Sequence, residues 1–355
     1  MASYSHGRRR WLSAILAIAS GMPVAKIALG AEPVAVRVGI AQTSSDVGLF
    51  IADKKGYFKQ EGLAVTFTPF DSAARMVAPL GAGQLDVGAG SASAGLYNAV
   101  ARGIEIKIVA DKGSTPPGYG FQPLLVRKDL VDSGRYKSLK DLKGMKIAGS
   151  APGSASTSTL NEALKKAGLK YTDVERVFMG FPQHVMALQN KAVDAAMTTE
   201  PSATRAVQSG AAVRIMGDDE IYPNHQLAVV LYSGDFIKDK PEAAKGFMRA
   251  YLRAVRDYND SLSNGRIAGP NAGEIIAILT EYTNIKDPAV YRAINTQGTN
   301  PNGRVNEVSL KNDLKFFKEE GLIQGNVTVE QVLDHSFADG AVKELGPYQP
   351  RSQRK

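Results

Sequence analysis

The sequence predicts an α/β protein with two lobes, each built on a mostly parallel sheet flanked by helices. Three observations predict this class. The chain has 355 residues, of which 44% are hydrophobic and 22% are charged, which is typical of a globular protein of about two domains. Strand-like and helix-like segments alternate from residue 34 onward, as in parallel sheets with helices on both faces. The alternation then occurs a second time with similar spacing.

The first copy of this repeat runs from about residue 36 to residue 110. Short runs of Val, Ile and Phe indicate its strands, while serine at the start and glycine at the end indicate its helices. The expected strands are Val36–Ala41, Val65–Phe70, Leu85–Gly88 and Ile104–Ala110. The expected helices run from about Asp46 to Gly56, from Ser72 to Leu80, and from Ser91 to Gly103.

The second copy covers about residues 145–216, after a strand that enters lobe two, and shares a spaced pattern with the first. Leu80-x-x-Gly83-x-x-Asp86 matches Leu188-x-x-Lys191-x-x-Asp194. The expected strands are Gln122–Lys128, Met145–Gly149, Val174–Met179, Val193–Thr198 and Val213–Met216, and the expected helices are Ser154–Ala167, Pro182–Gln189 and Pro201–Ser209. Two lobes of like topology explain the shared spacing; one continuous larger sheet is the alternative.

Two turn-like stretches connect the copies. Residues 113–120 hold two prolines and several glycines, and residues 218–224 are again turn-like, before an apolar strand at Gln226–Tyr232. The helical remainder is expected to pack back on lobe one: Lys240–Leu262, Gly273–Tyr282, Glu307–Glu320 and Thr328–Leu345. This arrangement predicts lobe one at 32–118 plus 226–345, lobe two at 119–225, and a basic tail at 346–355. Two crossings then join the lobes, with a cleft where they meet.

The first 31 residues are expected to be a cleavable export signal. Arg8, Arg9 and Arg10 precede an apolar run, and small residues up to Ala31 offer a cleavage site. The apolar run is short for a membrane-anchoring helix, which is the alternative. The Arg-Arg-x-Trp-Leu order resembles a twin-arginine signal, and general secretion stays open as a second route. With no cysteine to carry a lipid, we expect a periplasmic protein without a direct membrane anchor.

Charge and residue usage exclude several function classes. Without the four basic residues of the first 31 and the three of the last five, the net charge falls from +8 to +1, so no basic stripe for nucleic acid is expected. The chain has no cysteine, which excludes thiol catalysis, disulfides and thiolate metal sites. It also lacks His-x-x-x-His, Gly-x-Ser-x-Gly and a phosphate-binding Gly-x-x-x-x-Gly-Lys-Ser/Thr loop. We therefore expect no catalytic residue, no metal and no cofactor.

Candidate ligand-binding residues follow the predicted strands. In open parallel sheets, ligands bind beyond the carboxyl ends of strands, against helix N-termini. Hydroxyls and free N–H groups there suit an oxyanion, although a serine at a helix start can also be only a cap. The candidates at four such junctions are Gln42, Thr43, Ser44, Ser91, Ala92, Ser93, Ser154, Ser156, Thr157, Thr199 and Glu200.

Further candidates lie at the crossings. Tyr119 and Phe121 could wall the cleft against an aromatic or apolar part of a ligand, or simply pack the hinge. His225 could donate to a ligand or be a solvated or capped histidine. Glu200 could accept from a ligand amine or cap the helix that begins at Pro201.

Four motifs in order resemble those of ABC-importer solute-binding proteins that take up sulfonates, nitrate or thiamine-precursor pyrimidines. They are Lys54–Val65 (KKGYFKQEGLAV), Gly83–Gly88 (GQLDVG), Asp141–Ala148 (DLKGMKIA) followed by Gly153-Ser154, and Val193–Ala196 (VDAA) followed by Glu200-Pro201. The resemblance covers about residues 35–340. It implies a type II periplasmic binding fold with two hinge crossings. A related fungal enzyme of thiamine-pyrimidine synthesis uses a cysteine-rich motif, which this chain lacks.

The expected function is therefore that of a monomeric periplasmic solute-binding protein. It would close on a small sulfonate, carboxylate, nitrate or pyrimidine-like ligand and deliver it to a membrane permease with its ATPase. Two alternatives stay open: the receptor of an ion-driven secondary transporter, and an exported enzyme acting on a small acid.

Overall fold

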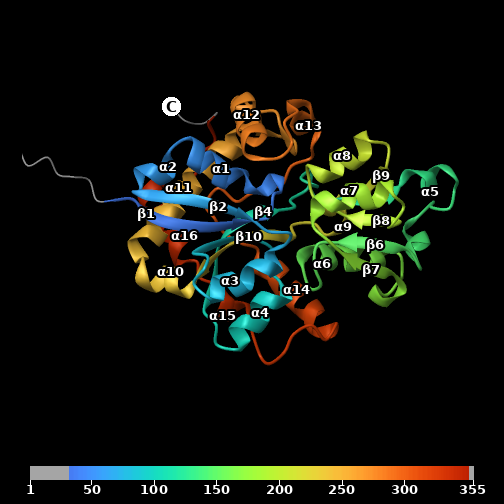
Figure 1. Cartoon of the computed structure of the whole chain (residues 1–355), viewed down its shortest axis with the longest axis horizontal. Helices are drawn as coiled ribbons and strands as arrows, with labels where there is room; N and C mark the ends of the chain where they lie inside the picture. Colours follow the sequence, from blue (N-terminus) through green and yellow to red (C-terminus); the bar gives the residue numbers. More distant parts are fainter. Residues whose placement is uncertain (1–31, 352–355) are drawn as a thin grey trace, which may run out of the picture. The chain divides into compact units, whose positions relative to one another are not determined.

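The computed structural model describes residues 32–351 (Figure 1). The predicted export signal at residues 1–31 and the end of the basic tail lie outside the described residues. Two five-stranded sheets, each with helices around it, carry the fold, as the sequence predicts. The alternative of one continuous sheet is wrong.

The first sheet has the strand order β2-β1-β3-β10-β4. Strand β1 pairs in parallel with β2 and β3, whereas β10 pairs antiparallel with β3 and β4. Four of the five strands therefore run in one direction. The bounds are β1 Val34–Ile40, β2 Leu63–Pro69, β3 Val87–Gly90, β4 Ile106–Ser114 and β10 Gln226–Ser233.

The second sheet repeats this arrangement in the order β7-β6-β8-β5-β9. Strand β6 pairs in parallel with β7 and β8, and β5 pairs antiparallel with β8 and β9. The bounds are β5 Leu124–Arg127, β6 Lys146–Gly149, β7 Glu175–Phe178, β8 Ala195–Met197 and β9 Ala212–Met216. In each sheet the single reversed strand is the one that enters after a crossing. The predicted lobe limits fall within these crossings and stay a prediction.

The helices lie largely where serine starts and glycine stops predict them. Helices up to residue 221 are α1 Val47–Lys54, α2 Tyr57–Gln60, α3 Val77–Gly81, α4 Ala94–Ala101, α5 Lys128–Asp132, α6 Ala155–Lys166, α7 Phe181–Gln189, α8 Ser202–Gln208 and α9 Asp218–Ile221. Short 3-10 turns are η1 Ser44–Asp46, η2 Ala73–Met76, η3 Leu139–Leu142 and η4 Tyr171–Asp173. The turn-like prediction at 218–224 is wrong in part, since α9 forms there.

The C-terminal helices add to the first lobe, as expected. Their bounds are α10 Gly234–Asp239, α11 Pro241–Asp260, α12 Ala272–Tyr282, α13 Pro288–Ala293, α14 Glu307–Glu319, α15 Val329–Val332 and α16 Ser336–Leu345, with a hairpin of β11 Leu262–Ser263 and β12 Arg266–Ile267. Helix α11 packs on α1, α2 and α16, and Phe247 stacks on Phe58 with ring centroids 4.7 Å apart. The predicted helix at 328–345 is broken, because Leu333 forms a parallel bridge with Ile108 of β4.

The matched pattern of the two copies has one structural role in both lobes. Asp86 accepts the backbone N–H of Arg37 in β1 at 2.8 Å, and Asp194 accepts that of Lys146 in β6 at 2.9 Å. Each carboxylate also forms an ion pair with an arginine, Asp86 with Arg37 and Asp194 with Arg127. Asp86 therefore holds the start of β3 to the middle of β1, and Asp194 holds the start of β8 to the start of β6.

We expect Asp86→Ala to lower the free energy of unfolding by roughly 2 kcal/mol at pH 7, because the Arg37 N–H and the guanidinium lose their acceptor. Burial by itself raises the pKa of Asp86, but the hydrogen bonds from Arg37 and Lys240 outweigh burial and lower the pKa below 3.8. The contribution of the Asp86 carboxylate to the free energy of unfolding is therefore fully present above the ordinary aspartate pKa. It is lost as the pH falls through the pKa of Asp86 in the folded protein.

Urea denaturation at pH 7 and at about pH 3 checks this prediction. The difference between variant and wild type should shrink in acid. Asp132→Ala, at an exposed pair with Lys128, is the control and should change stability by less than about 0.5 kcal/mol. An equal loss for both variants would contradict the prediction.

Candidate functional site

A small cavity of about 40 Å³ lies where segments of the two lobes face each other. It offers room for a few water-sized groups. From the first lobe it is lined by Ala41, Thr43, Ser45, Ser72, Ala73, Gly90, Ser91, Lys112, Leu227 and Ala228. From the second lobe it is lined by Phe121, Gln122, Ser150, Ala155, Ser156, Phe181 and Thr199.

The lining follows the carboxyl ends of the strands, as the fold physics predicts. Thr43 comes after β1, Ser72 after β2, and Ser91 after β3. In the second lobe Ser150 follows β6 and Thr199 follows β8. Because parallel strands end at the same edge of a sheet, the two edges together enclose one space.

Five of the predicted ligand-binding residues line this cavity. They are Thr43, Ser91, Phe121, Ser156 and Thr199. They come from both lobes, so the structure brings together residues that are up to 156 positions apart in the printed sequence. Whether they contact a ligand stays a prediction.

The other predicted residues lie outside the lining. Gln42 is exposed, Ala92 is buried in the apolar core, and Tyr119 is half-buried beside the first crossing. Several hydroxyls bond instead to the protein itself: Ser93 to Leu96 N, Ser154 to Ala151 O, Thr157 to Ser154 O, and Ser44 to Gln297 Oε1. For Ser93, which accepts the N–H of Leu96 at the start of α4, the bond agrees with the alternative of a simple cap, whereas Thr157 donates to a carbonyl and caps nothing.

The sequence analysis missed most of the lining, including Lys112, which is the one charged residue among the described residues that line the cavity. Its side chain is 1% exposed, and its Nζ lies 2.8 Å from Asp46 Oδ1 and donates to Ser45 Oγ at 2.7 Å. Asp46 is fully buried behind it and accepts the backbone N–H of Thr43 through Oδ2. The available signal was the pair Asp111-Lys112 directly after the apolar residues 108–110 of β4, because a buried lysine requires a partner.

Two buried polar atoms beside the cavity have no hydrogen-bond partner within the described chain. They are Thr199 Oγ1 and Gln122 Oε1, and both residues are less than 5% exposed. Buried polar atoms are nearly always paired in folded proteins. Both residues line the cavity.

Glu200 faces away from the cavity and lines a separate pocket with Arg214 and Arg266. Its Oε2 accepts the backbone N–H of Thr204 at 2.8 Å, and its Oε1 lies 3.4 Å from Arg214. Burial nevertheless raises its pKa to about 7. The carboxylate thus has the helix-capping role, while its backbone oxygen accepts the N–H of Ser44 across the cleft at 3.0 Å.

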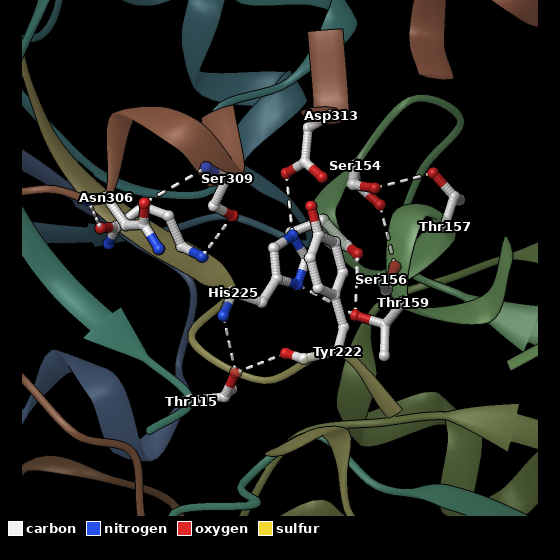
Figure 2. A network of polar contacts seen from close by, with 12 residues as sticks. Thr115, Ser154, Ser156, Thr157, Thr159, Tyr222, His225, Asn306, Ser309 and Asp313 are labelled. Atoms are coloured by element: carbon white, nitrogen blue, oxygen red, sulfur yellow. Dashed lines mark hydrogen bonds and ion pairs between the residues drawn. The ribbon is translucent and has the colours of Figure 1, made fainter. Parts of the chain in front are cut away.

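His225 is fully buried at the second crossing and does not line the cavity. Both ring nitrogens contact protein side chains, Nε2 with Asp313 and Nδ1 with Thr159 (Figure 2). Its ring stacks on Tyr222 with centroids 4.1 Å apart. The histidine is therefore part of a polar network beside the cavity.

Within residues 32–351, no three His, Cys, Asp or Glu side chains gather closely enough to hold a metal ion. No helix of that range has both the length and the apolar composition needed to cross a bilayer.

Two like lobes with one cavity between their strand ends define the periplasmic binding protein fold. A solved structure that shares it is the alkanesulfonate-binding protein SsuA from Xanthomonas axonopodis pv. citri bound to MOPS. That protein is 19% identical with a TM-score of 0.68, over 86% of this chain and 100% of that one. The chain belongs to the NMT1-like family, whose model matches residues 29–268.

Sequence relatives carry names of binding proteins. An aliphatic sulfonates-binding protein of Escherichia coli (strain K12) is 28% identical over 207 residues, which are 57% of this chain and 61% of that relative. The taurine-binding periplasmic protein of the same strain is 25% identical over 316 residues, 84% of this chain and 91% of that one. The desulfurization enzyme DSZB shares the fold at 14% identity, with a TM-score of 0.59 over 88% of this chain and 99% of that one.

The buried carboxyls of the second lobe should make stability depend on pH. Burial raises the pKa of Glu200 from 4.5 to about 7 and that of Asp218 from 3.8 to about 7. At a pH between the ordinary pKa of each carboxyl and its raised pKa of about 7, the folded protein keeps a proton that the unfolded chain has lost. Stability therefore falls as the pH rises towards 7. We expect Glu200→Gln to reduce this slope by up to about 1.4 kcal/mol per pH unit.

Urea denaturation at intervals from pH 4 to pH 8 measures the slope. The slope that remains in Glu200→Gln should disappear largely in the double variant with Asp218→Asn. An unchanged slope in both variants would show that neither carboxyl is protonated in the folded protein.

Proposed function

We propose that this protein is a periplasmic solute-binding protein that holds a small anionic solute between its lobes and delivers it to an ABC importer. The observation that carries the proposal is the cavity lined from both lobes, with the buried ammonium of Lys112 at its wall. A solute in this position contacts both lobes at once. It therefore stabilises the closed arrangement over an open one.

The polar groups of the lining favour an anion. Lys112 provides a positive charge, hydroxyls of Ser45, Ser91 and Ser156 provide donors, and helix α6 begins at the lining residue Ala155. A helix N-terminus carries partial positive charge and free N–H groups. A sulfonate, carboxylate or nitrate suits these donors. Since Glu200 faces away, the cavity offers no carboxylate to a pyrimidine amine or ring N–H.

The lining supports binding without chemistry on the solute. Lys112 is the one ionisable side chain among the described residues that line the cavity. Its contact with Ser45 resembles the hydroxyl–amine pair of some hydrolases, but Asp46 forms an ion pair with the same ammonium. The ammonium is thus engaged as a donor and not as a base. The shared fold of DSZB does not decide this question, because one fold can carry unrelated functions.

The names of the relatives support the location and the ligand class. One is named for aliphatic sulfonates, and another is a taurine-binding periplasmic protein. We propose export to the periplasm by the signal at residues 1–31, action as a monomer, and transfer to a permease and its ATPase. The proposed lobes are 32–118 plus 226–345 and 119–225. Neighbouring genes for an ATPase and a permease would separate this role from that of an ion-driven receptor.

Lys112→Met should weaken binding of a sulfonate probe at least tenfold, because the ligand loses a buried charged donor. Calorimetric titrations with taurine, methanesulfonate and nitrate measure the effect. Lys107→Met, on the same strand β4 with a bond to Gln331 O, is the matched control and should leave the affinity unchanged.

The double variant Lys112→Met with Asp46→Leu guards against misfolding, since it removes the aspartate charge that the single variant leaves buried and unpaired. It should fold and still bind weakly. Wild-type protein that binds none of the anions, or a Lys112 variant that binds as wild type, would overturn the proposed ligand class. Conversion of a probe by purified protein would favour an enzyme.

A further inference from the structure

His225 forms hydrogen bonds to two helices at once. Its Nε2 lies 2.8 Å from Asp313 Oδ2 on α14, and its Nδ1 lies 3.2 Å from Thr159 Oγ1 on α6 (Figure 2). The side chains of His225 and Asp313 are 0% and 1% exposed. Water is thus largely excluded from these bonds, which strengthens them.

The two helices belong to different lobes. Helix α14 is tied to the first sheet through β10: Gln226 N donates to Ser309 Oγ at 2.8 Å, and Asn306 N donates to Gln226 Oε1 at 2.7 Å. Helix α6 follows β6 of the second sheet. The imidazole of His225 therefore forms a bridge between an element of each lobe.

The bridge is fixed to both crossings. Thr115, just after β4, accepts the backbone N–H of His225 through Oγ1 at 2.9 Å and donates to Tyr222 O at 3.0 Å. The ring of His225 stacks on Tyr222 with an interplanar angle of 13°. The imidazole is therefore held in one orientation, and a rotation of one lobe against the other must strain or break its bonds.

The bridge also reaches the cavity through α6. Thr159 lies one turn along this helix from Ser156, which lines the cavity, and Ala155 at the helix start lines it as well. A bond that fixes Thr159 therefore fixes the lobe-two wall of the cavity relative to the crossing.

We propose that His225 is a positioning residue that stabilises the closed arrangement of the lobes through Thr159 and Asp313, without touching the solute. The expected effect of His225 on solute affinity rests on the proposed solute-binding function. The expected effect of His225 on lobe closure does not depend on that function.

The test uses the native absence of cysteine, which allows two labels at chosen sites. Cysteines at exposed Lys59 on α2 and Met186 on α7 report the distance between the lobes. Pulsed electron–electron double resonance between spin labels on the two cysteines measures this distance with and without taurine. Thr159→Val removes one bond of the bridge at nearly constant volume, together with the 3.2 Å bond from Thr159 Oγ1 to Ala155 O inside α6.

In Thr159→Val, we expect the ligand-free distances to shift towards longer values and the affinity for any anion bound by wild type to fall about fivefold, the effect of one hydrogen bond. His225→Phe, which keeps the stacking on Tyr222, should have the same effect. In that background Thr159→Val should leave the distances between the lobes unchanged, because the bond shared with His225 is already lost and the bond to Ala155 O lies within α6. Ser158→Ala is the control, since this buried hydroxyl on α6 has no partner in the described chain, and it should change neither quantity.

Unchanged distances in both Thr159→Val and His225→Phe, with only a lower free energy of unfolding, would overturn the proposal and leave a purely structural network. If His225→Phe fails to fold, Thr159→Val decides alone. Wild-type protein that binds no anion would count against the proposed function, and the ligand-free distances would still test the bridge.

Discussion

The double crossing of the chain is the constraint on which the rest of the structure depends. The chain leaves the first sheet after β4 and returns as β10, which inserts between β3 and β4. It enters the second sheet as β5, which inserts between β8 and β9. Each inserted strand runs against its neighbours. This connectivity brings the carboxyl ends of both sets of parallel strands to one space, where the cavity forms.

Inside that space, one charge dominates. A buried ammonium is costly unless it is paired, and Lys112 meets this requirement with Asp46 on one side and Ser45 on the other. The pairing fixes where the positive charge lies relative to the hydroxyls of both lobes. A solute that replaces water here finds its donors already oriented, which reduces the ordering cost of binding.

Features with a local physical cause could be predicted from the sequence. Strand and helix positions follow from apolar runs, serine starts and glycine stops, and the roles of Asp86 and Asp194 follow from the repeated spacing. Strand-end serines and threonines also indicated part of the cavity wall. By contrast, the pairing of Lys112 and the bridge of His225 depend on partners far away in the chain. Asp46 lies 66 positions from Lys112, and Asp313 lies 88 from His225, and no local pattern links such residues.

The insertion of β10 has a consequence for the order of folding. The first sheet lacks an interior strand until residues 226–233 arrive, whereas the second sheet is complete within one uninterrupted stretch of chain. If the second lobe folds first, the two ends of its stretch of chain come together. In the native state these ends are joined by backbone bonds between Thr115 and residues 224 and 225. Pairing β10 with β3 and β4 then no longer requires closing a long flexible loop. The entropic cost of completing the first sheet is therefore lower.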